Sequence, residues 1–368
     1  MNEKKQKRTK EQGVKNMHIG WIITLVILAA IAILFGVYAW KNMHPVAMRY
    51  REDALAAGYV EKDATLPDGS VIHYGEGPDN GPALLLIHGQ GGDWTHYGET
   101  LPALAKRFHV YSVDCFGHGG STHDPALYNC AVNSQALVWF LQNEVKEEAY
   151  LSGHSSGGIM ASWIAANAPE LTKGLVIEDS PLFEVTPEEM TEGAGGAAWF
   201  ESFLLRHNYL NQTQEPEYAV YYIQNSYFMN FFGDLRKPME KAVRQYRTEH
   251  PDEPVRIFWL PSMITEGMYL PNFDMRFSDT FYTGSWFDGM DQAETLAKIE
   301  CPTVYIKALV RYGKDGVLYA ANSDEDAQRV MDLIQDCQML TIKSGHNIHC
   351  EFPAFFVDAF DHLPGLAN

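Results

Sequence analysis

Short apolar runs alternate with longer segments of helical periodicity along most of the chain, and this alternation constrains the fold more than any other feature. Segments such as 133–148 and 158–170 have apolar residues at a spacing of three to four. Unbroken apolar strands separated by helices are typical of a mostly parallel sheet covered on both faces. The sequence therefore predicts an α/β, doubly wound fold. The apolar runs lie at 82–89, 108–117, 149–153, 173–180, 302–309 and 337–346.

A charge-free stretch at 19–40 precedes this pattern. As a helix it would be about 33 Å long, which matches a hydrocarbon core of ~30 Å. Trp21 and Trp40 lie near its ends, where aromatic rings favour the membrane interface. A cleaved signal peptide is the alternative, but its apolar region is usually only about 7–15 residues long. We therefore expect one uncleaved transmembrane helix, followed by a connector at 41–57.

Basic residues surround this stretch unevenly. Six lysines and arginines lie in the tail at 1–18, whereas only three follow the stretch before residue 52. Positive residues favour the cytoplasmic side, so we expect a cytoplasmic tail and a catalytic body on the extracytoplasmic side of a cell membrane.

The rest of the chain is strongly acidic. Nine of the 28 lysines and arginines fall in residues 1–51, which leaves 19 against 45 acidic residues in 52–368. Such a body would repel phosphate backbones, so a nucleic-acid partner is not expected. The five cysteines lack C-x-x-C spacing and indicate neither a zinc site nor a disulfide framework.

The alternation breaks between residues 183 and 287, where 22 residues are Phe, Tyr or Trp. That is about a fifth of the segment, against 12% of the whole chain. Aromatic residues could simply pack a helical insert, or they could also line an apolar substrate pocket. We therefore predict a cap insertion at 181–298 in a core formed by 58–180 and 299–368.

The segment 153–157, GHSSG, fits the pattern G-x-S-x-G directly after a predicted strand and before a predicted helix. A sharp turn there lifts the central serine above a sheet, and flanking glycines let neighbouring backbones approach. Ser155 has the central position. A phosphate-binding loop is not expected, because the lysine of G-x-x-x-x-G-K-[ST] is absent.

Four blocks in order resemble the α/β-hydrolase superfamily of lipases, esterases and peptidases over most of 58–365. They are LLLIHGQGG at 84–92, DCFGHGGS at 114–121, GHSSG at 153–157 and GHNIHCEFP at 345–353. The resemblance implies an eight-stranded, mostly parallel sheet with a cap after the sixth strand. It also implies hydrolase chemistry without a metal or an organic cofactor.

The resemblance assigns roles to individual residues. Ser155 would be the nucleophile and His346 its base, with His349 as the nearest rival. The oxyanion would accept hydrogen bonds from the backbone N–H groups of Gln90 and Ser156. Two further histidines, His88 and His118, are expected to order their loops.

The acid of the triad is the least determined residue. The order Ser…Asp/Glu…His requires it between 155 and 346. Asp315 follows the run at 302–309, where the family usually has its acid, and is the preferred candidate. Asp324 and Asp326 lie in the same long loop, and Asp179 ends the run at 173–180, where a minority of the family has the acid.

Together these features predict a membrane-anchored serine hydrolase acting on carboxylic esters of moderately apolar small molecules. Amidase, aminopeptidase, thioesterase or carbon–carbon hydrolase chemistry remains open on the same triad, because specificity depends on the cap and pocket. A catalytically silent surface binding module is a further alternative. The sequence does not specify the natural substrate, the disulfide state or the oligomeric state.

Overall fold

The computed structural model describes residues 3–183, 200–226, 228–266, 268, 272–312, 318 and 320–366, which form two compact units. The larger unit contains 46–236 and 270–368. The smaller unit combines 1–45 with 237–269. This division cuts across the predicted domain limits, because part of the expected cap at 181–298 groups with the N-terminal helix and the rest with the sheet.

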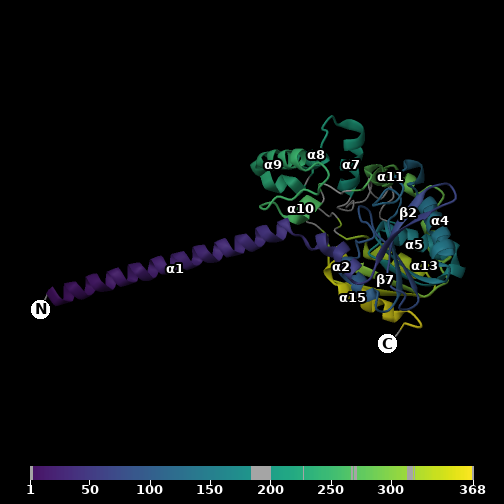
Figure 1. The fold of residues 1–368 in the computed structure, drawn as a ribbon, viewed down its shortest axis with the longest axis horizontal. Coiled ribbons are helices and arrows are strands. Elements are labelled where there is room, and N and C mark those ends of the chain that lie inside the picture. The colour runs from purple at the N-terminus through teal and green to yellow at the C-terminus, as the bar shows by residue number, and fades with distance from the viewer. Residues whose placement is uncertain are drawn as a thin grey trace. The chain divides into compact units, whose positions relative to one another are not determined.

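An eight-stranded sheet forms the centre of the larger unit (Figure 1). The strand order is β1-β2-β4-β3-β5-β6-β7-β8. β2 runs antiparallel to β1 and β4, and the remaining neighbours are parallel, which confirms the predicted fold class. The strands are β1 Val60–Thr65, β2 Val71–Glu76, β3 Ala83–Ile87, β4 His109–Val113, β5 Ala149–His154, β6 Thr172–Glu178, β7 Thr303–Ala308 and β8 Cys337–Ile342.

Alternate strand residues point into two hydrophobic clusters, one on each face of the sheet. Leu85 and Ile87 belong to one cluster, and Leu84 and Leu86 to the other. Both faces are buried, which explains why these strands are unbroken apolar runs. The first cluster includes residues of α4 Cys130–Phe140, α5 Ser156–Asn167, α12 Gln292–Ala297 and α13 Asp324–Leu333. The second includes residues of α2 Tyr50–Ala56, α3 Leu101–Leu104, α14 Ile348–Glu351 and α15 Pro353–Ala359.

The insert contributes helices to the larger unit. Phe277, Phe281 and Trp286 are buried against one another, with ring centroids 4.7–5.9 Å apart. They join the first hydrophobic cluster, so part of the aromatic enrichment serves to pack this segment. The elements concerned are α7 Phe200–Gln212, α8 Tyr218–Asn225, η6 Phe228–Leu235, α11 Met275–Thr283 and η7 Ser285–Phe287.

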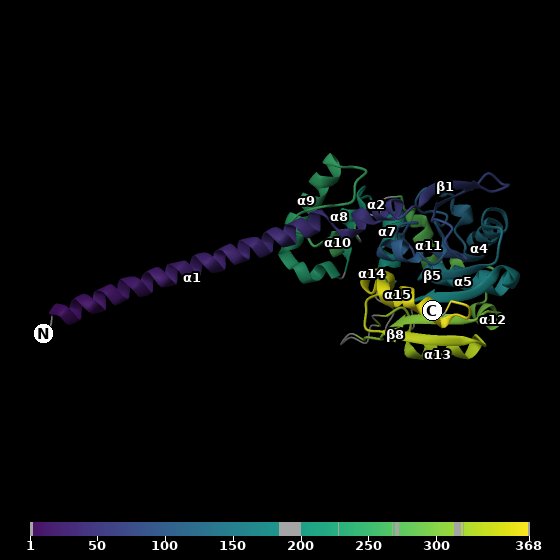
Figure 2. The same cartoon turned by 60° about the horizontal axis from the view of Figure 1, so that its bottom comes forward.

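The smaller unit is built on α1 Glu3–Met43, whose residues 19–43 are long and apolar enough to cross a membrane. The C-terminal part of α1 contacts α10 Ser262–Glu266 and residues of the segment that follows α9 Arg236–Glu249 (Figure 2). The Tyr38 hydroxyl donates to the carbonyl oxygen of Trp259 at 3.2 Å, and the Phe35 ring lies edge-on to Phe258 at 6.2 Å. The last turns of α1 are therefore part of a folded unit.

Candidate active site

Ser155 lies in the turn between β5 and α5 in a strained backbone conformation. Its φ is 54° and its ψ is −122°, a region that residues other than glycine rarely adopt. Two contacts hold the turn: the Ser155 N–H donates to the carbonyl oxygen of Glu178 at 2.9 Å, and the Ser180 hydroxyl donates to the Ser155 carbonyl oxygen at 2.8 Å. Such strain is found at functional sites, where surrounding contacts enforce it.

The glycines of GHSSG are required by close packing. A Cβ on Gly157 would overlap the Ile87 carbonyl oxygen of β3, and one on Gly153 would overlap the Gly157 carbonyl oxygen. A Cβ on Gly158 would meet the Ser180 hydroxyl. The turn thus packs directly against the strand ends. The G-x-S-x-G pattern predicted that its glycines allow this close approach of backbones.

His346 and Asp179 meet at the carboxyl edge of the sheet. The Nδ1 atom of His346 lies 2.8 Å from Oδ2 of Asp179. Asp179 directly follows β6 and is 1% exposed, whereas the His346 side chain is 30% exposed. The other carboxylate oxygen of Asp179 accepts from the Ala308 N–H at 2.9 Å, which fixes the carboxylate. A buried carboxylate in this position would keep the Nδ1–H tautomer of the imidazole.

The other acidic candidates differ in what they contact. Asp324 pairs with the buried Lys307 at 3.2 Å, and Asp326 accepts a hydrogen bond from the Ser323 hydroxyl at the start of α13. Asp315, the candidate preferred from the sequence, lies outside the described residues. Among the described acidic residues weighed from the sequence, Asp179 alone contacts His346.

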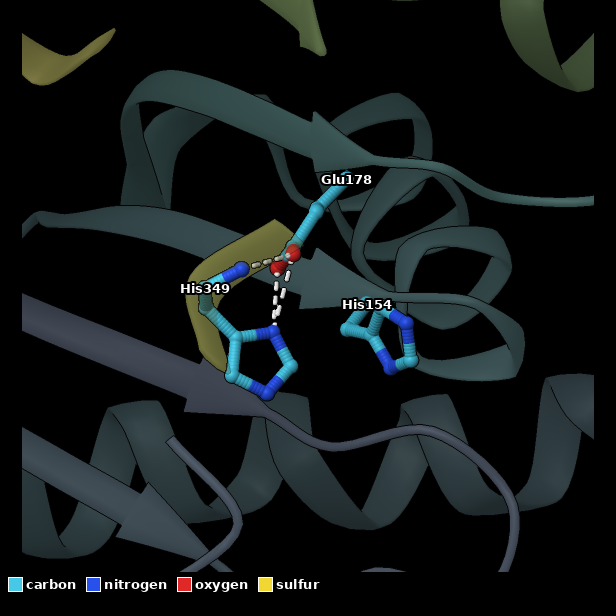
Figure 3. Close-up of side chains that lie close together, drawn as sticks. All are labelled: His154, Glu178 and His349. Carbon is cyan, nitrogen blue, oxygen red and sulfur yellow. Dashed lines mark hydrogen bonds and ion pairs between the residues drawn. The ribbon is translucent and has the colours of Figure 1, made fainter. Parts of the chain in front are cut away.

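Glu178 and His349 form a second carboxylate–histidine pair (Figure 3). Both oxygens of Glu178 lie within 2.9 Å of Nδ1 of His349, and one also accepts the His349 backbone N–H at 2.8 Å. Both side chains are fully buried. Burial by itself would lower the pKa of His349, but the Glu178 carboxylate raises it to about 10. The pair therefore fastens the histidine loop to the end of β6, one residue from Asp179.

The residue types of His154, Glu178 and His349 would suit a metal ion, and their donor atoms lie within 4.8 Å of one another. One ring nitrogen of each histidine is already engaged. His349 Nδ1 is taken by Glu178, and Nε2 of His154 lies 3.1 Å from the carbonyl oxygen of His346. The His154 ring also packs against the His346 ring at 4.5 Å. These contacts join the group to the loop that carries His346.

The loop after β3 approaches Ser155 closely. An added Cβ on Gly89 would lie 2.9 Å from the Cβ of Ser155. Two neutral histidines hold this loop, because burial lowers the pKa values of both His88 and His118. Nε2 of His88 accepts from the Cys115 N–H and Nε2 of His118 accepts from the Gly91 N–H, each at 3.0 Å. Both histidines thus order loops, as their positions in the sequence indicated.

The backbone N–H groups of Gln90 and Ser156 are the predicted oxyanion donors. Gln90 follows Gly89 in this loop, and Ser156 is the first residue of α5. Neither N–H donates to a protein acceptor in the described part of the chain. The Gln90 side chain is engaged separately: its Oε1 accepts from Arg206 at 2.6 Å and from the Ser278 hydroxyl at 2.9 Å. No pattern in the sequence predicted this contact of Arg206.

Known proteins share this architecture. A model of the alpha/beta hydrolase family matches residues 84–359. A Haemophilus influenzae protein named "Putative esterase/lipase" is 25% identical over 76% of this chain and 82% of its own length. The match to "Bifunctional epoxide hydrolase 2" of Sus scrofa, at 31% identity, covers 36% of this chain and only 24% of the relative.

Solved structures agree at the level of the fold. A membrane phospholipase A, described as a bacterial virulence factor, superimposes with a TM-score of 0.56 at 20% identity, over 93% of this chain and 97% of the other. A hydrolase from Pseudomonas aeruginosa gives a TM-score of 0.57 at 20% identity, over 83% and 98%. With its sheet, the Ser155 turn after β5 and the match over 84–359, the chain belongs to the alpha/beta hydrolase family and is a hydrolase.

Proposed function

We propose that this protein is a membrane-anchored serine hydrolase that cleaves carboxylic esters of moderately apolar substrates through Ser155, His346 and Asp179. The observation that carries the proposal is the 2.8 Å contact between His346 Nδ1 and the buried Asp179 carboxylate, at the sheet edge that also holds the strained Ser155 turn. Asp179 thereby replaces Asp315 as our preferred acid.

In the proposed reaction the same side chains act first in acylation of Ser155 and then in deacylation. Asp179 accepts the Nδ1–H of His346, so the lone pair of the imidazole is on Nε2, which takes the Ser155 proton as Oγ attacks the ester carbonyl. The N–H groups of Gln90 and Ser156 stabilise the oxyanion. The imidazolium then protonates the leaving alcohol. Water attacks the acyl-enzyme by the same route, which releases the acid and restores Ser155.

The ester assignment is the first prediction to test. The full-length protein in detergent micelles would be given an ester, an amide and a thioester with the same acyl chain, together with a fluorophosphonate probe. We expect one probe per chain, attached to Ser155, and fastest turnover of the ester. Faster turnover of the amide or thioester would replace the ester assignment, and a chain that neither binds the probe nor turns over any substrate would be a silent binding module.

Contacts of α1 support a retained anchor over a cleaved signal peptide. Beyond the contacts of Tyr38 and Phe35, the Asn42 side chain donates to the Phe258 carbonyl oxygen and accepts from the Ser262 N–H, both at 3.2 Å. Removing the apolar helix would leave these backbone groups without their partners. We propose that 19–40 spans a cell membrane with the basic tail in the cytoplasm.

The second prediction concerns this anchor. We expect the protein to stay in the membrane fraction after alkaline carbonate washing, because the apolar helix is held by the bilayer and not by charge. Protease added from outside should degrade the hydrolase body and spare an N-terminal fragment. A soluble mature form beginning near residue 45 would contradict the anchor. If the body were instead protected from the added protease, the proposed orientation would be wrong.

A further inference from the structure

Arg206 is a buried cation beside the candidate active site. It lies on α7 and is 9% exposed. Its guanidinium donates to Gln90 Oε1 at 2.6 Å and to the Ser278 hydroxyl at 3.1 Å, and it lies 5.4 Å from the centroid of the Phe273 ring. An arginine side chain stays charged at any pH that a protein tolerates. The charge is therefore present inside the larger unit.

This charge has no carboxylate partner within the described residues. The described groups in contact with Arg206 are the Gln90 amide, the hydroxyls of Ser278 and Tyr218, and the Phe273 ring, all of them neutral. Three of the other arginines in the larger unit are more exposed and pair with an acidic side chain: Arg51, Arg107 and Arg276. A buried charge without a counter-charge is unfavourable, so the surroundings that the structure describes for Arg206 favour an anionic ligand.

Unused donors accompany the charge. Nε of Arg206 and Nε2 of Gln90 are buried and have no hydrogen-bond acceptor in the described structure. Gln90 Oε1 is held by Arg206 and Ser278, which orients the amide so that its NH₂ group is the free end. The guanidinium Nε–H and the neighbouring amide N–H suit an anion with two or more oxygens, such as a carboxylate or a phosphate.

The site is close to the reacting centre. Gln90 is the predicted oxyanion residue, and the preceding Gly89 packs against the side chain of Ser155. We propose that Arg206, with the Gln90 amide, binds an anionic group of the substrate near its scissile carbonyl. This inference rests on the proposed ester hydrolysis and narrows its substrates to apolar esters that also carry a carboxylate or phosphate. The acidic body would otherwise disfavour such anions.

The test compares charge selectivity in the full-length enzyme. One pair of substrates is a nitrophenyl hemiester of glutarate and its neutral methyl ester. A second pair is an acylglycerol phosphate and the corresponding acylglycerol. The measured quantity is the ratio of kcat/KM for the anionic and the neutral member. We expect the wild type to favour the anion in at least one pair, and that pair identifies carboxylate or phosphate as the ligand.

Arg206→Gln should lower this ratio by about 100-fold, because the charge-assisted hydrogen bonds are lost. Arg206→Lys should recover part of it, since a lysine keeps the charge but not the fork of donors. Arg276→Gln is the matched control: it removes the same charge from an arginine whose side chain is 55% exposed, and the ratio should not change. A purely structural arginine would instead lower turnover of both members equally.

Labelling of Ser155 by a fluorophosphonate separates this inference from the proposed function. A wild type that is labelled but shows no preference for either anion would overturn the role of Arg206 and leave the hydrolase assignment standing. If Arg206→Gln does not fold, glutarate monoester and glycerol phosphate would be tested as competitors of labelling in the wild type. Protection by an anion, but not by its neutral counterpart, is the expected result, and equal protection would contradict the site.

Discussion

Replacing Ser155 by alanine is expected to lower kcat by about 10⁶-fold, which is the scale of losing a serine nucleophile in a triad enzyme. The loss should leave the fold intact, since the turn is held by backbone contacts to Glu178 and by the Ser180 hydroxyl. Ester turnover and fluorophosphonate labelling measure the effect, and thermal unfolding checks the fold.

Ser156→Ala is the matched control, because the neighbouring serine would contribute only its backbone N–H. Its side chain is buried at the start of α5, so a moderate change in stability is acceptable but labelling should persist. If labelling were lost in Ser156→Ala and survived in Ser155→Ala, the nucleophile would be Ser156 and our assignment would be wrong.

Asp179→Asn is expected to lower kcat by roughly 10⁴-fold with little change in the fold. The Ala308 N–H would hold the amide oxygen, so the NH₂ group would face His346 Nδ1 and favour the wrong tautomer. Asparagine also tolerates a positive φ, and the φ of Asp179 is 39°. The measurement is kcat on any ester that the enzyme turns over.

Two further variants complete this test. Asp324→Asn removes an exposed carboxylate that pairs with Lys307, and it should cost little activity. Asp315→Asn should also be mild if Asp179 is the acid. The reverse ranking, with Asp315→Asn severe and Asp179→Asn mild, would return the acid to the position that the sequence favoured.

The strands were predictable because both faces of the sheet are buried, so a segment such as 83–87 is apolar at every position. The turn at Ser155 was predictable for a related reason. Its glycines are required because backbone atoms a few residues away, or in the neighbouring strand, leave no room for a Cβ. This requirement appears in the sequence as a short local pattern.

The acid was harder to predict, because β6 and β7 are neighbours and each is followed by an aspartate in the sequence. What brings Asp179 to His346 is the backbone conformation after β6, which the sequence does not display. Arg206 was missed for a similar reason. In ESFLLRHNYL it resembles any basic residue of an amphipathic helix, and its burial depends on contacts with Gln90 and Ser278, which are distant in the chain.

The contacts at the end of α1 bear on how recombinant fragments of this protein should be designed. A fragment cut at residue 45 to improve solubility would lose Tyr38 and Asn42, and with them the groups that meet the backbone of 258–262. It would also uncover more of Phe258, whose ring is already 49% exposed. A bare aromatic surface of this kind favours self-association. Fragments that keep the final turns of the helix, handled in detergent, preserve the smaller unit as it folds.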